Sequence, residues 1–327
     1  MKKLIVAALL LAGCQQATWS DVDTKAMELA SGGKTVEVQD RRPPPGPRPG
    51  GPGGPPPARK HTETSKGELK LVKADQEPGF ENEVKIEVND KEKLRIITCN
   101  SIPKHKVGKF PNAGNPNRIE KQSITWKLPL NPKQNDDATA FDLGTFGVGV
   151  NGVIFDPQAA EWYLGDRDSG WQYDALGGAV TLGLDENYAH VQPNGLYHYH
   201  GLPGGLLENL EFTKGKHSPL VGYALDGFPI YAVYGNGEKG VQEFKSSYRL
   251  KKGKRPDGKG EPGGKYDGTF LADYEYVKDL GDLDECNGKF VKTPEYPDGT
   301  YAYFLTKEFP VVPRKFKGTP VKGAIKK

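Results

Sequence analysis

The sequence predicts a mainly β protein: an antiparallel sandwich or barrel-like domain with an internal duplicated unit, preceded by a disordered linker rich in Pro and Gly. Three observations support this class. Short stretches alternate apolar and polar residues, Gly (42) and Pro (27) together supply about a fifth of the 327 residues, and no long amphipathic helix has start and stop signals. Because only 35% of the residues are hydrophobic, part of the chain is not expected to fold.

The N-terminus has the pattern of an export signal. Met1-Lys2-Lys3 is followed by an apolar run over residues 4–13 and then by Cys14. A basic start before a short apolar run is typical of a signal peptide, and this run is too short to remain as a membrane-spanning helix. No apolar stretch in the sequence reaches the roughly 18 residues of a membrane span, which argues against an integral membrane protein.

The end of this run, Leu11-Ala12-Gly13-Cys14, resembles the lipobox of bacterial lipoproteins, in which the chain is cleaved before the Cys and lipid is attached to its sulfur. The resemblance implies that residues 1–13 are removed and that acylated Cys14 anchors the protein to a lipid bilayer. Gln15 replaces the Asp that retains some lipoproteins at the inner membrane, so we expect an outer-membrane or cell-surface location. An ordinary signal peptide with an incidental Cys is the alternative.

Two further cysteines, Cys99 and Cys286, lie in the region expected to fold. Outside the cytoplasm an even pair most simply forms a disulfide, and we predict one here. The alternative is a thiolate metal or redox site. Neither residue has a partner at Cys-x-x-Cys spacing, which favours the disulfide.

Residues 14–79 are predicted to form a flexible linker. Residues 41–60 contain nine Pro, five Gly and five basic residues but no acid. Pro favours extended polyproline II and Gly prevents a rigid rod, so this segment is expected to act as a spacer above the membrane. Its positive charge can hold it near anionic envelope polymers. Because the segment has no aromatic side chain to stack on bases, no nucleic-acid partner is expected.

The β domain is predicted to span residues 80–313, with a basic flexible tail over residues 314–327. The one helix expected is short, over 206–212. Strands are predicted over 84–88, 94–96, 123–128, 148–155, 179–184, 197–200, 221–233 and 300–306.

The β region contains an internal repeat of three motifs in the same order. They are an Asx-Gly turn within an apolar stretch (151–152 and 226–227), Leu-Asp-Glu (184–186 and 283–285), and Pro-Asx-Gly-x-Tyr-x-Tyr-x (193–200 and 297–304). This order predicts a duplicated unit. His198 and His200 of the first copy are replaced by Ala302 and Phe304 in the second, so a specialised function is expected of the first copy.

Three histidines of the first copy, His190, His198 and His200, are predicted to bind a transition metal, Zn or Cu. Residues i and i+2 of a strand share one face about 6.5 Å apart, so His198 and His200 can reach one ion while Tyr197 and Tyr199 point away. His190 lies across the Pro-Asn-Gly turn, and three imidazoles leave a coordination position open. The alternative is a pair of half-exposed histidines that bind no metal.

Two nearby acids, Asp185 and Glu186, are candidates for catalysis. Each can act as a general base or accept a hydrogen bond from a histidine N–H group. The second copy keeps Asp284 and Glu285 without the histidines, so a structural role for the acids fits the sequence as well.

The segment 162–173 combines Trp and Tyr with Asp, a composition that binds sugar rings or, alternatively, closes a core. No nucleophile elbow, phosphate loop or dinucleotide fingerprint is present in the sequence, so no reaction is assigned.

The stretch Asn194-Gly-Leu-Tyr-His-Tyr-His-Gly-Leu-Pro resembles the bacterial YHYH-domain proteins, which are named for this tetrapeptide and are often exported. Supporting stretches begin at residues 98, 150, 222 and 283, and the resemblance covers roughly residues 95–315. It implies a YHYH-type domain but no reaction, because the family is largely uncharacterised. Members often carry a histidine-bearing second motif and a Cys-containing segment before the first, where this chain has Tyr301-Ala-Tyr-Phe and Asn187-Tyr-Ala.

The net charge of +3 hides a division between segments. Residues 41–60 and 311–327 hold eleven of the 45 basic residues and no acid, and the signal peptide holds two more, so the rest of the chain has about ten more acidic than basic residues. This surplus favours cation capture. The sequence therefore predicts a membrane-anchored, extracytoplasmic metal-binding β domain. The alternatives are a metal-dependent hydrolase of an extracellular polymer and an adhesion or carbohydrate-binding protein that uses no metal.

Overall fold

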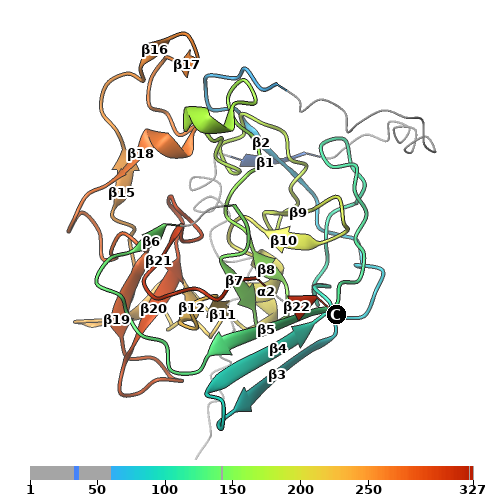
Figure 1. Cartoon of the computed structure of the whole chain (residues 1–327). Helices are drawn as coiled ribbons and strands as arrows, with labels where there is room; N and C mark the ends of the chain where they lie inside the picture. The colour runs from blue at the N-terminus through green and yellow to red at the C-terminus, as the bar shows by residue number, and fades with distance from the viewer. Residues whose placement is uncertain (1–32, 37–59, 141–142, 324, 327) are drawn as a thin grey trace, which may run out of the picture.

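The computed structural model describes residues 33–36, 60–140, 143–323 and 325–326 (Figure 1). The predicted signal peptide, Cys14 and residues 41–59 of the linker lie outside the described residues. The described part is mainly β, as predicted, and its sheets do not close into a barrel. None of its helices is long and apolar enough to cross a membrane.

The largest sheet has eight strands in the order β19-β20-β12-β11-β7-β8-β10-β9 and runs through the middle of the molecule (Figure 1). Most neighbouring strands are antiparallel, but β8 with β10 and β12 with β20 are parallel, which the prediction of an antiparallel domain missed. The strands are β7 (Gly147–Gly149), β8 (Ile154–Phe155), β9 (Ala189–Val191), β10 (Tyr197–Tyr199), β11 (Gly222–Ala224), β12 (Pro229–Ala232), β19 (Gly288–Val291) and β20 (Thr300–Leu305).

A second sheet of four strands lies at the bottom of the view in Figure 1. Its order is β22 (Ile325–Lys326), β5 (Ile124–Pro129), β4 (Leu94–Cys99) and β3 (Val84–Asn89). Strand β4 buries every second residue, Arg95, Ile97 and Cys99, as the period of two requires. The guanidinium carbon of Arg95 lies 3.7 Å from the centre of the Tyr223 ring on β11, so β4 contacts the eight-stranded sheet.

Smaller elements complete the chain. The two-stranded sheets are β1 (Gly33–Val36) with β2 (Leu69–Val72), β13 (Tyr234–Gly237) with β14 (Gly240–Glu243), β15 (Tyr248–Leu250) with β18 (Tyr274–Tyr276), β16 (Asp257–Gly258) with β17 (Glu261–Pro262), and β21 (Lys315–Phe316) with β6 (Thr139–Ala140). Among the described residues, the α-helix is α2 (Gly204–Asn209), close to the predicted position, and the 3-10 helices are η2 (Arg167–Ser169) and η3 (Leu271–Asp273). Strand β1 pairs with β2 in parallel.

The predicted strand over 179–184 is wrong. Gly178 and Gly183 adopt φ values of +71° and +64°, which interrupt an extended strand at both ends. The segment runs as a loop beside β2, where the Leu184 carbonyl accepts a hydrogen bond from the Val72 N–H at 2.8 Å.

Both predicted boundaries of the folded domain need correction. Residues 60–79 were assigned to the linker, but Leu69 and Leu71 of β2 are 5% and 8% exposed and belong to the core. The start of the predicted tail is folded as well, because Phe316 is buried and stacks on Phe146 at 4.9 Å between ring centroids. The apolar residues in these mostly polar segments pack onto the core.

The internal duplication is confirmed by the strand pairing. Each copy has a hairpin (β7-β8 or β11-β12), a parallel pair (β8-β10 or β12-β20) and an antiparallel edge strand (β9 or β19), and the copies meet where β7 pairs with β11. The Asx-Gly turns agree too, since Gly152 and Gly227 have φ values of +81° and +93°.

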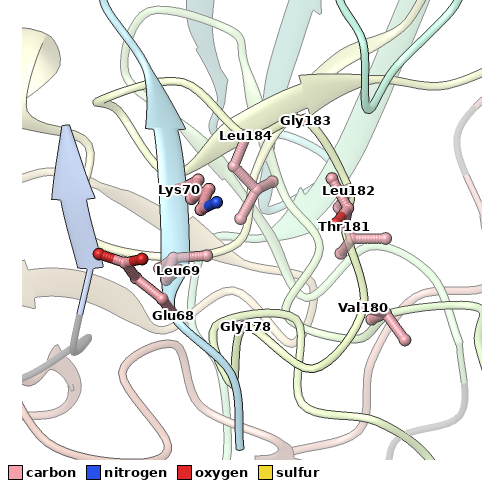
Figure 2. Close-up of a pocket in the computed structure, with 9 residues that line it drawn as sticks. All are labelled: Glu68, Leu69, Lys70, Gly178, Val180, Thr181, Leu182, Gly183 and Leu184. Atoms are coloured by element: carbon pink, nitrogen blue, oxygen red, sulfur yellow. The ribbon is translucent and has the colours of Figure 1, made fainter. Parts of the chain in front are cut away.

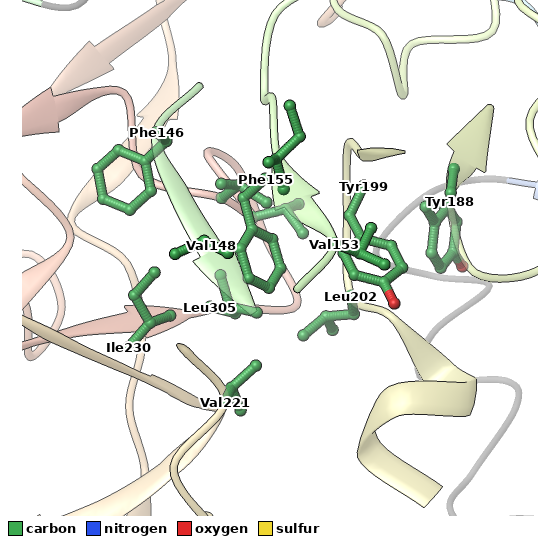
Figure 3. Close-up of a cluster of buried hydrophobic side chains, with 14 of the residues drawn as sticks. Phe146, Val148, Val153, Phe155, Tyr188, Tyr199, Leu202, Val221, Ile230 and Leu305 are labelled. Carbon is green, nitrogen blue, oxygen red and sulfur yellow. The ribbon is translucent and has the colours of Figure 1, made fainter. Parts of the chain in front are cut away.

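The main core cluster combines buried side chains of both copies with those of β2, β4 and β5. Figure 3 shows part of it, where apolar side chains of both copies meet and Tyr199 contributes its ring. The residues labelled there are all buried: Phe146, Val148, Val153, Phe155, Tyr188, Tyr199, Leu202, Val221, Ile230 and Leu305.

The predicted disulfide is not present in the structure, in which Cys99 and Cys286 are both free and buried. Cys99 ends β4 in the four-stranded sheet, whereas Cys286 lies in the turn before β19, the edge strand of the other sheet. The two thiols therefore belong to different parts of the fold.

Candidate metal centre

The three predicted ligands come together at the edge of the first copy. His190 on β9 pairs directly with His198 on β10, and His200 follows two residues later on the same face. Tyr197 and Tyr199 alternate with them on the opposite face, where the Tyr197 hydroxyl donates to Asp185 at 2.8 Å. The predicted separation of His and Tyr faces is confirmed.

The three imidazole rings form a nearly equilateral triangle. Their centroids are 4.7, 4.8 and 4.7 Å apart, and neighbouring planes meet at 66°, 79° and 63°. One ligand atom of each ring lies within 4.8 Å of the other two. Nitrogens bound to one tetrahedral Zn²⁺ are about 3.3 Å apart, given bonds of about 2.0–2.1 Å. Small ring movements are enough to reach that spacing.

Backbone carbonyls set the tautomers of two rings. The Nδ1 of His190 lies 2.8 Å from the Leu182 carbonyl oxygen, and that of His198 lies 3.2 Å from the Leu196 carbonyl oxygen. Because a carbonyl only accepts, each Nδ1 carries the proton and each Nε2 presents a lone pair. This is the arrangement in which outer hydrogen bonds prepare histidine for a metal.

His200 has the least satisfied ring of the three. Its Nε2 lies 3.2 Å from the Nε2 of His190, and its buried Nδ1 has no hydrogen-bond partner among the described residues. A buried nitrogen without a partner costs free energy. A cation bound by the three rings would use lone pairs that the surrounding residues leave free.

Burial keeps the cluster neutral. His198 and His200 are each 2% exposed, and desolvation lowers the pKa of both well below the usual value of 6.5. The pKa of His190 is also lowered by burial. Since only the neutral imidazole donates a lone pair to a metal, the cluster is held in its ligating form.

A cavity of about 500 Å³ opens beside the three histidines. Its lining includes the exposed residues Pro116, Ala160 and Pro193, so it reaches the surface. It also includes Asp156, a residue that the sequence interpretation missed because it stands in an apolar stretch next to Pro157. The signal in the sequence that could have identified Asp156 is a carboxylate at the end of an otherwise apolar strand.

The second copy has no histidine at the corresponding positions, and two of the three are buried apolar residues. Lys289, Ala302 and Phe304 take the positions of His190, His198 and His200, because Lys289 pairs with Ala302 as His190 pairs with His198. Phe304 packs edge-on against Phe244 with centroids 4.7 Å apart, in a cluster with Tyr231 and Leu283.

The candidate acids have their hydrogen bonds elsewhere. Asp185 is fully buried and accepts from the backbone N–H groups of Gly108, Asn187 and Ala189 and from the Tyr197 hydroxyl. Glu186 accepts from the Ala74 N–H at 2.8 Å. Both acids connect segments of the scaffold.

A second cavity of about 290 Å³ separates β2 from the segment 178–184 (Figure 2). Thr181 and Leu182 line both cavities. The Leu182 carbonyl holds the Nδ1 of His190, so the loop that replaces the predicted strand over 179–184 also orients a candidate ligand.

The segment proposed for sugar binding mostly closes the core. Trp171 and Tyr173 are 8% and 0% exposed, and both rings pack against the buried Phe270. Arg167 lies over the half-buried Trp162.

Comparison with known proteins agrees with these features. The model of the YHYH protein family matches residues 125–318, which is more than half of the chain. The chain belongs to the YHYH family. The matched YHYH region begins in β5, contains all three histidines and ends just after β21. No curated protein and no solved structure matches the chain.

Proposed function

We propose that this YHYH protein is a lipid-anchored, extracytoplasmic domain that binds a transition metal, Zn or Cu, through His190, His198 and His200. The observation that carries the proposal is the convergence of three buried, neutral imidazoles whose ligand atoms lie within 4.8 Å of one another. Imidazole nitrogens are common ligands of both metals. Metal capture at the cell surface is the function that this arrangement supports best.

The location rests on the sequence. The lipobox resemblance at Leu11–Cys14 supports anchoring through acylated Cys14, and the basic segment 41–60 supports contact with anionic envelope polymers. A Cys14→Ser variant should move from the membrane fraction to the soluble fraction. If that variant stays with the membrane, the lipid anchor is wrong.

Metal analysis of the purified chain tests the metal site. We expect close to one equivalent of Zn or Cu in the wild type after incubation and desalting, and a loss of at least tenfold in the His198→Ala/His200→Ala double variant. His217→Ala is the matched control, because His217 lies outside the cluster and should leave the metal content unchanged. Equal metal content in wild type and double variant would contradict the proposal.

A metal-dependent hydrolase is the second candidate, favoured by the cavity of about 500 Å³ beside the three rings. The three histidines line that cavity, and a metal held by three protein ligands would keep a coordination position for water, as a hydrolytic metal site requires. Turnover of ester or glycan substrates by the metal-loaded chain, lost in the double variant, would assign an enzyme; a loaded chain without turnover is a binding protein.

A further inference from the structure

We infer that Asp156 is the second functional group of this site and that it accepts a hydrogen bond from a small neutral or cationic molecule held between the carboxylate and the metal. The inference rests on the proposed metal site and names the class of ligand that enters its open position.

Asp156 is placed to serve the cavity. It directly follows β8, and its backbone N–H donates to the Tyr199 carbonyl at 2.9 Å, beside His200 in the neighbouring strand. The side chain is 6% exposed, and Gln192 donates to its Oδ2 at 3.4 Å. Its Oδ1 is buried and makes no hydrogen bond of ordinary geometry among the described residues, although the backbone N–H of Gln158 lies near enough to lower the pKa of the carboxyl group. A buried carboxylate oxygen without a well-aligned donor is costly, which suggests that a bound molecule supplies one.

The carboxylate does not join the three rings as a ligand. The cluster whose ligand atoms lie within 4.8 Å of one another contains His190, His198 and His200 but not Asp156. The acid therefore lies outside the cluster of ligand atoms, while all four residues line the same cavity. A molecule with a lone pair at one end and an N–H or O–H group at the other could bind the metal and the carboxylate together.

Comparison with the second copy removes a structural explanation for the acid. Tyr231 follows its Asx-Gly turn by the same number of residues as Asp156 follows the first one, so the two positions are equivalent. Tyr231 pairs with Phe304, which is the equivalent of His200. Tyr231 is fully buried, packs against Phe304 and satisfies its hydroxyl with Thr293 and Glu295. The fold accepts a large aromatic residue here, so it does not require a carboxylate.

The charge of the lining selects the ligand. Asp156 and Glu161 are its ionisable residues besides the histidines, and no Lys or Arg is among the described residues that line the cavity. Arg314 donates to the Pro157 carbonyl and to Asp174, and its positive charge lowers the pKa of Asp156, but it does not line the cavity. An anion such as phosphate would meet carboxylates without a cationic side chain, so neutral and cationic molecules are favoured.

The test uses the full chain loaded with Co²⁺, whose visible absorption reports ligands entering the open position. Imidazole is the first probe, because it offers a lone pair at one nitrogen and an N–H donor at the other; 1-methylimidazole lacks the donor. Because burial raises the pKa of Asp156 to about 7, binding is measured at pH 8.5, where the carboxylate is ionised. We expect wild type to bind imidazole about tenfold more tightly than 1-methylimidazole there, as a charge-assisted hydrogen bond provides. Inorganic phosphate should bind at least tenfold more weakly than imidazole.

The variants separate this inference from the proposed function. The Asp156→Asn variant should keep its cobalt, bind imidazole and 1-methylimidazole with affinities that differ by less than twofold, and bind phosphate more tightly than wild type does. Glu161→Gln is the matched control and should keep the wild-type preference for imidazole. Asp156→Ala serves as the second variant if the amide alters the melting temperature. An unchanged preference in both Asp156 variants, or equal binding of phosphate and imidazole by wild type, overturns the inference while the metal site stands. Loss of cobalt in both Asp156 variants would make Asp156 a ligand and also overturn it, and a wild type without cobalt overturns both proposals.

Discussion

Removing the Tyr197 hydroxyl tests whether Asp185 is a structural hub. That hydroxyl donates to the Asp185 carboxylate at 2.8 Å, and both residues are 0% exposed. In Tyr197→Phe no water reaches the site to replace the donor, so the loss of a hydrogen bond to a charged group should lower the free energy of unfolding by about 2 kcal/mol at pH 8. Urea unfolding monitored by tyrosine and tryptophan fluorescence measures this change.

The second copy supplies the control. Tyr301 donates to the equivalent Asp284 at 2.9 Å, but Asp284 is only half-buried, so water can take the place of the lost hydroxyl. We expect Tyr301→Phe to cost about 1 kcal/mol, roughly half of the Tyr197→Phe effect. Equal costs in the two copies, or no cost for Tyr197→Phe, would refute the reasoning from burial.

The pH dependence adds an independent check. Burial raises the folded-state pKa of Asp185 to about 6, so the carboxylate is ionised at pH 8 and protonated at pH 5. The Tyr197 hydrogen bond is charge-assisted only when Asp185 is ionised. The cost of Tyr197→Phe should therefore fall to about 1 kcal/mol at pH 5. A cost that grows as the pH falls would have the wrong sign.

Three further outcomes follow from burial elsewhere in the chain. Burial lowers the pKa of His105 to about 4, so only the unfolded state gains a proton as the pH falls below 6.5. Between pH 7 and 4.5, the free energy of unfolding of wild type should therefore fall by about 2.5 kcal/mol more than that of His105→Gln. An equal fall in the two proteins, measured by urea unfolding, would contradict this prediction. Leu69→Ala should cost about 2–5 kcal/mol in the same assay, since Leu69 is 5% exposed, whereas a residue of a flexible linker would cost nothing. Alkylation of the denatured chain without reductant should label Cys99 and Cys286. Labelling of the native chain should be slow, because burial raises the pKa values of the two thiols to about 11 and about 12. If the denatured chain is labelled only after reduction, the two residues form the disulfide that the sequence predicts.

Local patterns explain what could be predicted from the sequence. Alternating residues in β3, β4 and β5 and the Asx-Gly turns depend on neighbours within a few positions, so these elements were found close to their observed bounds. The histidine site was predictable for the same reason, because His198 and His200 share a strand face and His190 lies one hairpin away.

The errors arose where distant contacts decide the structure. Residues 60–79 look polar, yet Leu69 belongs to a core cluster whose members extend along the chain as far as Phe316. A Cys pair carries no information about the distance between Cys99 and Cys286, and the disulfide was inferred from number alone. Asp156 was missed because its importance comes from the cavity, which forms only when β8, β9 and β10 are assembled.

The duplication shows that the fold does not need the three histidines. Tyr197 and Tyr301 bind equivalent acids, and the backbone N–H groups of His200 and Phe304 donate to equivalent carbonyls at 2.7 and 3.0 Å. One scaffold is thus built twice, once around an apolar cluster and once around buried imidazoles beside a cavity. Because an apolar core costs less than buried polar rings with an unpaired nitrogen, stability alone favours the second copy's solution. This cost supports the proposal that the first copy keeps its histidines to bind a cation.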